Sequence, residues 1–327
     1  MERQLTVFSS FNGAVSVSIG TSVEDLGPAE PVEWLSTPPG GVWMEAVVDA
    51  GDGTFYGHYH NEMPATECHT DAKVRPRIGA GRSVDRGRTW EDLGIILEDP
   101  EPSLCSTANK YNVGGVGDFS AILDRDRQYL YIVYSVYAAS AEAQGIAVAR
   151  MLWADRDEPA GALAVWQSGL WLPATLTLTG TDADETNRDA TDPEPGSEEG
   201  APRAVWTYPQ GTPIYAATRS WHSASGRVDA FWGPSAHWNS YLDSYVMLVT
   251  RSTMTTFSVE GIYILLAPDL ANPETWMQPV KILSGGSWYP QVMGSPSDDG
   301  SDTVAGQRAR FFLAGSSSNV IEFTRQR

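Results

Sequence analysis

The sequence SVDRGRTW at residues 83–90 carries the clearest signal of fold in this chain. Ser83 and Asp85 stand where their side chains can bond the backbone of a tight turn, and Gly87 stands where a positive φ is needed. Trp90 follows at the position that packs beneath a β-hairpin. Because all of this is local turn chemistry, we expect these residues to be structural, and Asp85 is not a catalytic candidate.

The composition is typical of an all-β chain with many turns. The 327 residues include 31 glycines and 21 prolines, and only 19% of residues are charged. We predict almost no helix. Since β-propellers of this size form one unit, we treat residues 1–327 as a single domain.

The charge of the chain limits its partners. The formal net charge is −19, and the only lysines are Lys73, Lys110 and Lys281. Such a surface repels nucleic-acid phosphates and anionic lipid. No apolar run approaches the roughly 20 residues that span a bilayer. We therefore expect neither nucleic acid nor a membrane as a partner.

The two cysteines, Cys68 and Cys105, flank the hairpin of residues 83–90. In an exported protein they would form a disulfide, and two free buried thiols are the alternative. No C-x-x-C pair occurs, so we predict no zinc site. Residues 1–4 lack the apolar core of a signal peptide. We expect a secreted or periplasmic protein whose signal peptide has been removed, with a cytoplasmic protein as the alternative.

A repeated pattern divides the chain into blades. Four segments share a strand-start pattern: residues 43–49, 118–124, 233–239 and 289–294. Strands rich in β-branched and aromatic residues follow the first three, at residues 54–60, 129–137 and 245–250. Third strands are expected at residues 145–153 and 261–267. Such spacing predicts a β-propeller rather than a sandwich.

We predict five blades, with six as the alternative. Residues 4–34 and 201–231 are expected to supply the fifth blade or to extend the others. Residues 4–34 could close the ring by pairing with the C-terminal strands, which would remove free sheet edges. Residues 181–200 are strongly acidic and contain no aliphatic residue larger than alanine, so we interpret them as a solvated loop insertion. A structural calcium ion held there by Asp182, Asp184 and Glu185 is the sharper alternative.

Strand alternation predicts which side chains line the central channel. Residues two apart face the same way, and the innermost strand of each blade faces the axis. Aligning the four starts gives two rings of side chains: Trp43, Asp118, Gly233 and Tyr289, then Glu45, Ser120, Ser235 and Gln291. His237 is one step further along the same face, and Asn239 ends that segment. This mixture of aromatic and polar groups is typical of sugar sites.

The ends of the second strands open on the same rim. They bring His60 and Glu62 from the first blade and Arg251 from the third. Glu45 is the strongest candidate, because a carboxylate within the apolar run VWMEAVV is costly to bury unless it is paired or functional. The predicted substrate-binding set is Trp43, His60, Ser120, Ser235, His237, Asn239, Arg251, Tyr289 and Gln291.

As a whole the pattern resembles the five-bladed propeller glycoside hydrolases, the arabinanase, xylosidase and invertase-like group. The SVDRGRTW turn is similar to the Asp-box of sialidase-like propellers, although Arg251 alone is no arginine triad. In the five-bladed group, carboxylates on successive first strands supply the base or nucleophile, a tuning group and the acid. The resemblance gives Glu45 the first role and Asp118 the tuning or acid role. The first strand of the third blade offers Ser235 and no carboxylate, so the acid would come from Glu62.

The resulting prediction is hydrolysis of a neutral polysaccharide or oligosaccharide, with no cofactor or metal required. A carbohydrate-binding propeller without catalysis is one alternative, and a polysaccharide lyase that uses His and Tyr is another. The lectin alternative would be favoured if Glu45, Glu62 and Asp118 did not meet within roughly 10 Å.

Overall fold

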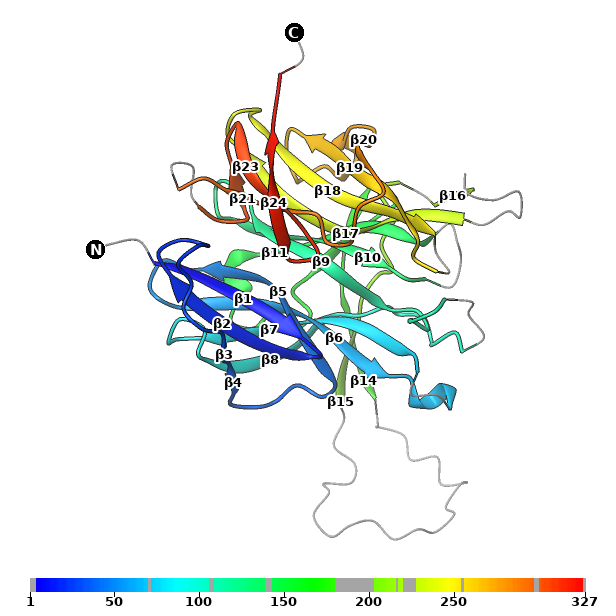
Figure 1. The fold of residues 1–327 in the computed structure, drawn as a ribbon. Helices are drawn as coiled ribbons and strands as arrows, with labels where there is room; N and C mark the ends of the chain where they lie inside the picture. Colours follow the sequence, from blue (N-terminus) through cyan, green and yellow to red (C-terminus); the bar gives the residue numbers. More distant parts are fainter. Residues whose placement is uncertain are drawn as a thin grey trace, which may run out of the picture.

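The computed structural model describes residues 4–69, 72–105, 109–138, 143–179, 203–215, 217–219, 228–253, 256–296 and 300–325. The described chain is almost all β and forms a five-bladed propeller (Figure 1). The helical elements with described bounds are the 3-10 turns η1 (Thr66–Cys68), η3 (Trp153–Asp155) and η4 (Pro273–Thr275). None of the described helices is long and apolar enough to cross a membrane. The predicted fold class is confirmed.

Three blades are large antiparallel sheets. The first consists of β5 (Gly41–Asp49), β6 (Phe55–Pro64), β7 (Val74–Ser83) and β8 (Thr89–Leu97), with β4 (Glu33–Trp34) parallel to β8. The second consists of β9 (Val116–Leu123), β10 (Tyr129–Val136), β11 (Gly145–Leu152), β12 (Ala164–Gln167) and β13 (Leu170–Pro173). The third consists of β16 (Thr218–Arg219), β17 (Val228–Asn239), β18 (Ser244–Thr253), β19 (Val259–Ala267) and β20 (Val280–Ser284), with β22 (Val304–Ala305) parallel to β17.

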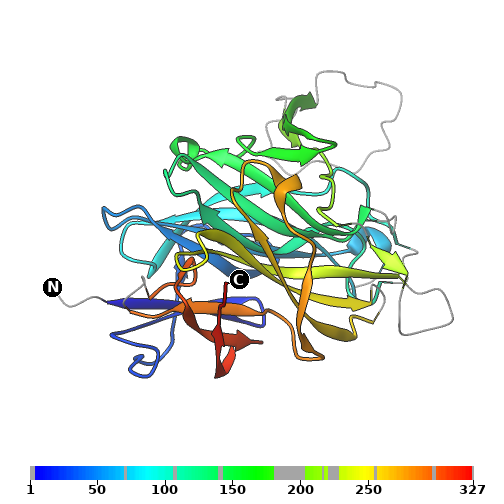
Figure 2. The same ribbon diagram turned by 90° about the horizontal axis from the view of Figure 1, so that it is seen from above.

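Two smaller sheets complete the ring and lie side by side in Figure 2. One consists of β21 (Gln291–Gly294), β23 (Arg308–Leu313) and β24 (Ser316–Glu322), and the other of β1 (Leu5–Phe11), β2 (Ala14–Gly20) and β3 (Glu30–Pro31). The N-terminal segment thus builds a sheet of its own. The predicted pairing with the C-terminal strands is absent from the described ladders, and an ion pair between Arg310 and Glu24 connects the two sheets instead.

A two-stranded hairpin, β14 (Thr175–Thr179) and β15 (Arg203–Thr207), projects from the second blade (Figure 1). The acidic loop predicted at residues 181–200, with its calcium alternative, lies outside the described residues.

Apolar side chains fill the spaces between blades. Ile132 and Tyr134 of β10 pack with Ile78 of the first blade, while Val133 of the same strand packs with Met247 of the third. Because β10 presents alternate side chains to its two neighbours, it is buried on both faces and carries an uninterrupted apolar run.

The turn between β7 and β8 has a dense set of local hydrogen bonds. The Gly87 amide donates to Ser83 Oγ (2.8 Å), and the Thr89 amide donates to Asp85 Oδ1 (2.9 Å). Gly87 has a φ of +87°, and the fully buried Trp90 donates from its indole to the Gly87 carbonyl (2.9 Å). Toward the other end of β7, a disulfide joins Cys68 to Cys105, whose Cα atoms are 5.1 Å apart.

Side chains of the inner strands connect successive blades. Ser10 Oγ accepts from the Met44 amide (2.9 Å), Glu45 Oε2 from the Phe119 amide, and Ser120 Oγ from the Ala236 amide (3.1 Å). Glu45 directly follows the donor Met44, and Ser120 directly follows the donor Phe119. The acceptors Ser10, Glu45 and Ser120 therefore occupy equivalent positions in their blades.

This register corrects the sequence alignment in the third blade. The residue after Ala236 is His237, so His237 and not Ser235 is equivalent to Glu45 and Ser120. The sequence alignment assumed regular alternation from Gly233, which fails in β17 because Gly233 and Pro234 together oppose one residue of β18.

Candidate functional site

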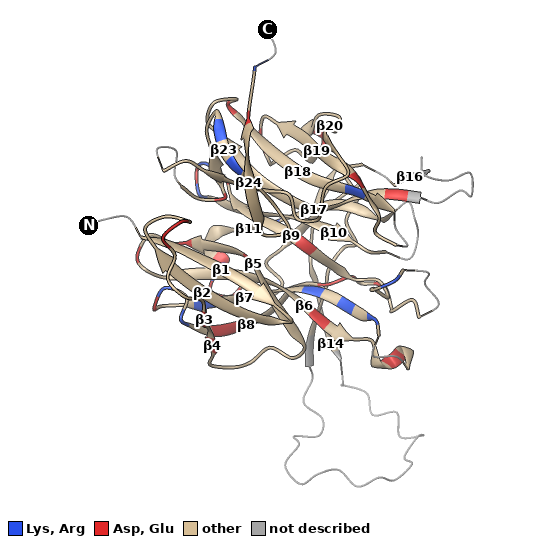
Figure 3. Ribbon diagram, in the orientation of Figure 1, with Lys and Arg blue, Asp and Glu red and all other residues tan. Residues whose placement is uncertain are grey.

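The imidazole of His60, on β6, is surrounded by three carboxylates. Its Nδ1 lies 3.5 Å from Glu45 Oε1 and 3.5 Å from Asp118 Oδ1, and its Nε2 lies 3.5 Å from Glu62 Oε1. The His60 side chain is 7% exposed and Glu62 is 33% exposed. Figure 3 shows the acidic segments of β6 and β9 in red. The three predicted carboxylates therefore meet around one ring.

Two β-bulges direct Glu45 and Asp118 to this point. On β5, Met44 pairs with Tyr59 and Ala46 with His58, which leaves Glu45 as the extra residue. On β9, Asp118 is the extra residue between Gly117 and Phe119, and its φ is +38°. Bulges turn a side chain out of the regular alternation and are common beside active sites. A left-handed φ in a residue other than glycine is also typical of functional positions.

Four groups hold Asp118 in place. The Tyr137 hydroxyl donates to Oδ2 (2.6 Å) and the Tyr289 hydroxyl donates to Oδ1 (3.3 Å). Ser135 Oγ donates to the Asp118 carbonyl (3.1 Å), and the Asp118 amide donates to His60 Nδ1 (3.0 Å). Both the carboxylate and the unusual backbone conformation are therefore fixed from outside.

Sequence reasoning missed Tyr137, which follows β10. It is 4% exposed, and its ring stacks on Trp232 at a centroid distance of 5.2 Å. The sequence did contain a signal for it. In the first and third blades, the end of the second strand was predicted to lie at the rim, and the same rule applies to the second blade. That rule leads directly to Tyr137.

The environments of the two inner carboxylates shift their pKa values in opposite directions. Burial raises the pKa of Glu45, the charge of Asp118 raises it further, and the contacts with His60 only partly offset this. Burial also acts to raise the pKa of Asp118, but hydrogen bonds from His60, Tyr137 and Tyr289 outweigh it and lower that pKa.

The three carboxylates alter the pKa of His60. Burial lowers its pKa, and the amide of Asp118 favours a neutral ring because a protonated Nδ1 cannot accept a hydrogen bond. The contacts with the three carboxylates outweigh both effects, so the pKa of His60 is raised well above its ordinary value. Close by, the Trp43 ring meets His60 edge to face, with centroids 5.8 Å apart.

Glu45, His60 and Asp118 also offer atoms that could hold a cation, since their ligand atoms lie within 4.8 Å of one another. Carboxylate oxygens suit a hard divalent ion. However, Nδ1 of His60 already accepts the Asp118 amide, which competes with a metal for that lone pair. The absence of a required metal therefore stays a prediction.

The remaining predicted residues lie away from the His60 cluster or have structural partners. Ser120 connects blades, as described above, and Gln291 donates to Asp302 Oδ2 (3.1 Å). Asn239 is fully buried and bonds the Gly306 carbonyl and the Leu242 amide. Arg251 lies over the rings of Phe231 and Tyr263.

His237 and Ser235 complete that set. His237 is fully buried beside Phe323, and burial lowers its pKa to about 3. It is thus a neutral core histidine. Ser235 is half-buried on β17, where it pairs with Leu248 of β18.

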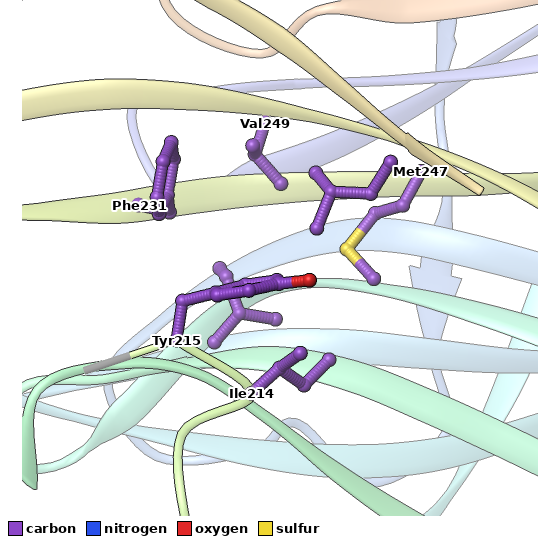
Figure 4. A pocket seen from close by; sticks show the side chains of 7 residues that line it. Ile214, Tyr215, Phe231, Met247 and Val249 are labelled. Carbon is purple, nitrogen blue, oxygen red and sulfur yellow. The ribbon is translucent and has the colours of Figure 1, made fainter. Parts of the chain in front are cut away.

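A small apolar cavity between the second and third blades has no functional character. It is lined by Ile214, Tyr215, Phe231, Met247 and Val249, which Figure 4 labels, and its volume is about 10 Å³. A space of that size barely holds one water molecule, and its lining offers few polar partners. It is a packing gap.

Comparison with known proteins identifies the fold. No protein-family model matches the sequence, and no curated protein is similar to it in sequence. A solved structure described as a thermostable family-43 glycoside hydrolase superposes with a TM-score of 0.53, over 100% of this chain and 88% of that chain, at 12% identity. The endo-arabinase from Bacteroides thetaiotaomicron gives a TM-score of 0.52 over 99% of this chain and 90% of that chain, at 10% identity.

In fold, the chain resembles the family-43 glycoside hydrolases. The resemblance predicted from the sequence is thus confirmed for the propeller architecture. At this level of identity the similarity concerns the fold alone, so the chemistry depends on the residues around His60.

Proposed function

We propose that this protein hydrolyses glycosidic bonds in a neutral polysaccharide or oligosaccharide. The convergence of Glu45, Asp118 and Glu62 on His60 carries the proposal. Gathering three carboxylates at one half-buried point lowers the stability of the fold, and a site that only bound sugar would not need three of them. Glycosidases need paired carboxylates whose environments push their pKa values apart.

The shifted pKa values support one division of roles. Glu45, whose pKa is raised, is the general acid that protonates the leaving oxygen. Asp118 stays ionised, and its charge keeps Glu45 protonated. Glu62 is the most exposed of the three carboxylates and is the base that activates water. This division exchanges the roles of Glu45 and Glu62 relative to those implied by the sequence resemblance.

A polysaccharide lyase is less well supported. Tyr289 is half-exposed beside Asp118, as such an enzyme would need. The charge of Asp118 and burial raise the pKa of the Tyr289 phenol, which makes it a poor base. Lyases act on acidic sugars, and three carboxylates would repel such a substrate.

The proposed setting is an oxidising compartment. The Cys68–Cys105 disulfide supports export, because such bonds persist mainly outside the cytosol. Carbohydrate is then the expected partner, and the acidic composition argues against nucleic acid.

The test is an assay of the purified protein on a panel of neutral polysaccharides, read as new reducing ends. Arabinan belongs first in the panel, since one structural neighbour is an endo-arabinase. Release of reducing sugar from at least one substrate is expected. Saturable binding without release would favour a carbohydrate-binding propeller, and products absorbing in the ultraviolet would indicate a lyase.

A further inference from the structure

A cleft lies between the second and third blades, away from the His60 cluster. Its volume is about 490 Å³. It is lined by the turn after β9 (residues 124–126), by Trp238 of β17 and Tyr245 of β18, and by residues 268–271 that follow β19. This volume falls within the range of roughly 300–1,000 Å³ that small-molecule sites occupy.

The cleft is at the opposite end of the inner strands from the candidate active site. Asp118 stands near the start of β9, and Asp124 directly follows its last residue. Six residues of strand separate the two positions by about 20 Å. A ligand in this cleft therefore does not contact the carboxylates around His60.

Aromatic rings form the inner wall. Tyr131 and Tyr245 are buried, and Trp238 is half-buried with its ring edge to face with Tyr245 at 4.9 Å. The amide of Arg125 donates to the Tyr245 hydroxyl (3.3 Å). This contact connects the turn after β9 to the third blade.

Charged groups form the rim. The Arg125 guanidinium lies over the Trp238 ring, 4.4 Å from its centroid, yet its side chain is 63% exposed. Asp126 and Asp269 line the same cleft and are exposed. An aromatic wall with a guanidinium donor and carboxylate acceptors matches the chemistry of a sugar ring, whose C–H face packs on an aromatic ring while its hydroxyls bond to polar groups.

We propose that this cleft is a second, non-catalytic binding site for a neutral sugar residue. Trp238 and Tyr245 provide the apolar wall, and Asp126 and Asp269 accept from ligand hydroxyls. Arg125, whose guanidinium lies 4.0 Å from Asp243, donates to them. Acidic side chains outnumber the single arginine on the rim, so an anionic sugar is disfavoured. The proposal shares the substrate class of the proposed function but depends on none of its catalytic groups.

Equilibrium binding tests the proposal in the Glu45→Gln protein, where turnover does not consume the probe. Arabinohexaose, xylohexaose and cellohexaose are titrated by calorimetry. At least one probe is expected to bind at a site that Arg125→Ala weakens by about tenfold or more, the loss of one charged hydrogen bond. Trp238→Ala should weaken the same site. Since Arg125 is largely exposed, its variant reports binding even if Trp238→Ala fails to fold.

Arg127→Ala is the matched control, because it removes an arginine from the same turn whose side chain donates to the Asp49 carbonyl and does not line the cleft. Binding unchanged in Arg127→Ala and weakened in Arg125→Ala supports the proposal. The proposal is overturned if the Glu45→Gln protein and its Arg125→Ala and Arg127→Ala variants bind the probe equally, or if no probe binds up to about 10 mM. Hydrolysis by the unmodified protein is measured separately, so the proposal and the proposed function can fail independently.

Discussion

The Tyr137 hydroxyl donates a 2.6 Å hydrogen bond to the carboxylate of Asp118. With His60 and Tyr289, it stabilises the ionised form of a carboxylate whose pKa burial acts to raise. Asp118 in turn raises the pKa of Glu45. A buried tyrosine thus influences the group that is proposed to protonate the leaving oxygen.

Tyr137→Phe should therefore lower the stability of the fold and weaken the effect of Asp118 on the pKa of Glu45. Losing a hydrogen bond to a charged, half-buried carboxylate costs about 1.5–3 kcal/mol, measurable by denaturant titration. The pKa of Asp118 should rise and that of Glu45 should fall. The alkaline limit of activity then moves to lower pH, whereas an unchanged pH profile would mean that Tyr137 acts through packing alone.

Asp118 should also contribute to acid unfolding. Its folded pKa is lowered, so its stabilising effect is present above the unfolded value of about 3.9 and is lost as pH falls through the folded pKa. Comparing melting temperatures of the wild type and Asp118→Asn should show the largest difference above about pH 4 and a shrinking difference below it. A difference that stays constant across this range would contradict the lowered pKa.

Glu45 behaves in the opposite sense. Its folded pKa is raised, so its contribution is fully present below the unfolded value of about 4.3 and is lost as pH rises through the folded pKa. At neutral pH, Glu45→Gln should melt at the same or a higher temperature. The glutamine oxygen can still accept from the Phe119 amide, so the connection between blades survives. A much lower melting temperature would show that the charge itself is structural.

The geometry around His60 also predicts the stereochemical outcome. Glu45 and Glu62 contact opposite nitrogens of the imidazole, each at 3.5 Å. The ring therefore separates the acid from the base, as in inverting enzymes, whose carboxyl groups are roughly 6.5–9.5 Å apart. Proton NMR of the first product should show inversion at the anomeric carbon, and retention would require a different pair of carboxylates.

Much of the fold could be predicted because strand periodicity and turn chemistry are local. The blade starts, the second strands and the tight turn at residues 83–90 depend only on neighbouring residues. The closure of the ring depends on long-range pairing: the N-terminal segment was expected to supply a fifth blade or to extend another, and it forms a sheet of its own without the suggested pairing to the C-terminal strands.

The candidate site could be predicted only in part. Glu45 was conspicuous as a carboxylate in an apolar run, and Glu62 and His60 followed from the strand end. Strict alternation fails at bulges, which no local pattern in this sequence marks. His237 was aligned with the channel by that alternation, but it is fully buried beside Phe323.

Hydrolysis by paired variants tests the central claim most directly. Glu45→Gln should reduce turnover of a polysaccharide by at least about 100-fold, and turnover of a dinitrophenyl glycoside by under about tenfold, because that leaving group needs no proton. Glu62→Gln should reduce both, and Glu322→Gln, an exposed glutamate on β24, should reduce neither. Folded Glu45→Gln and Glu62→Gln proteins that both retain full activity on the polysaccharide would contradict the assignment of catalysis to the carboxylates around His60.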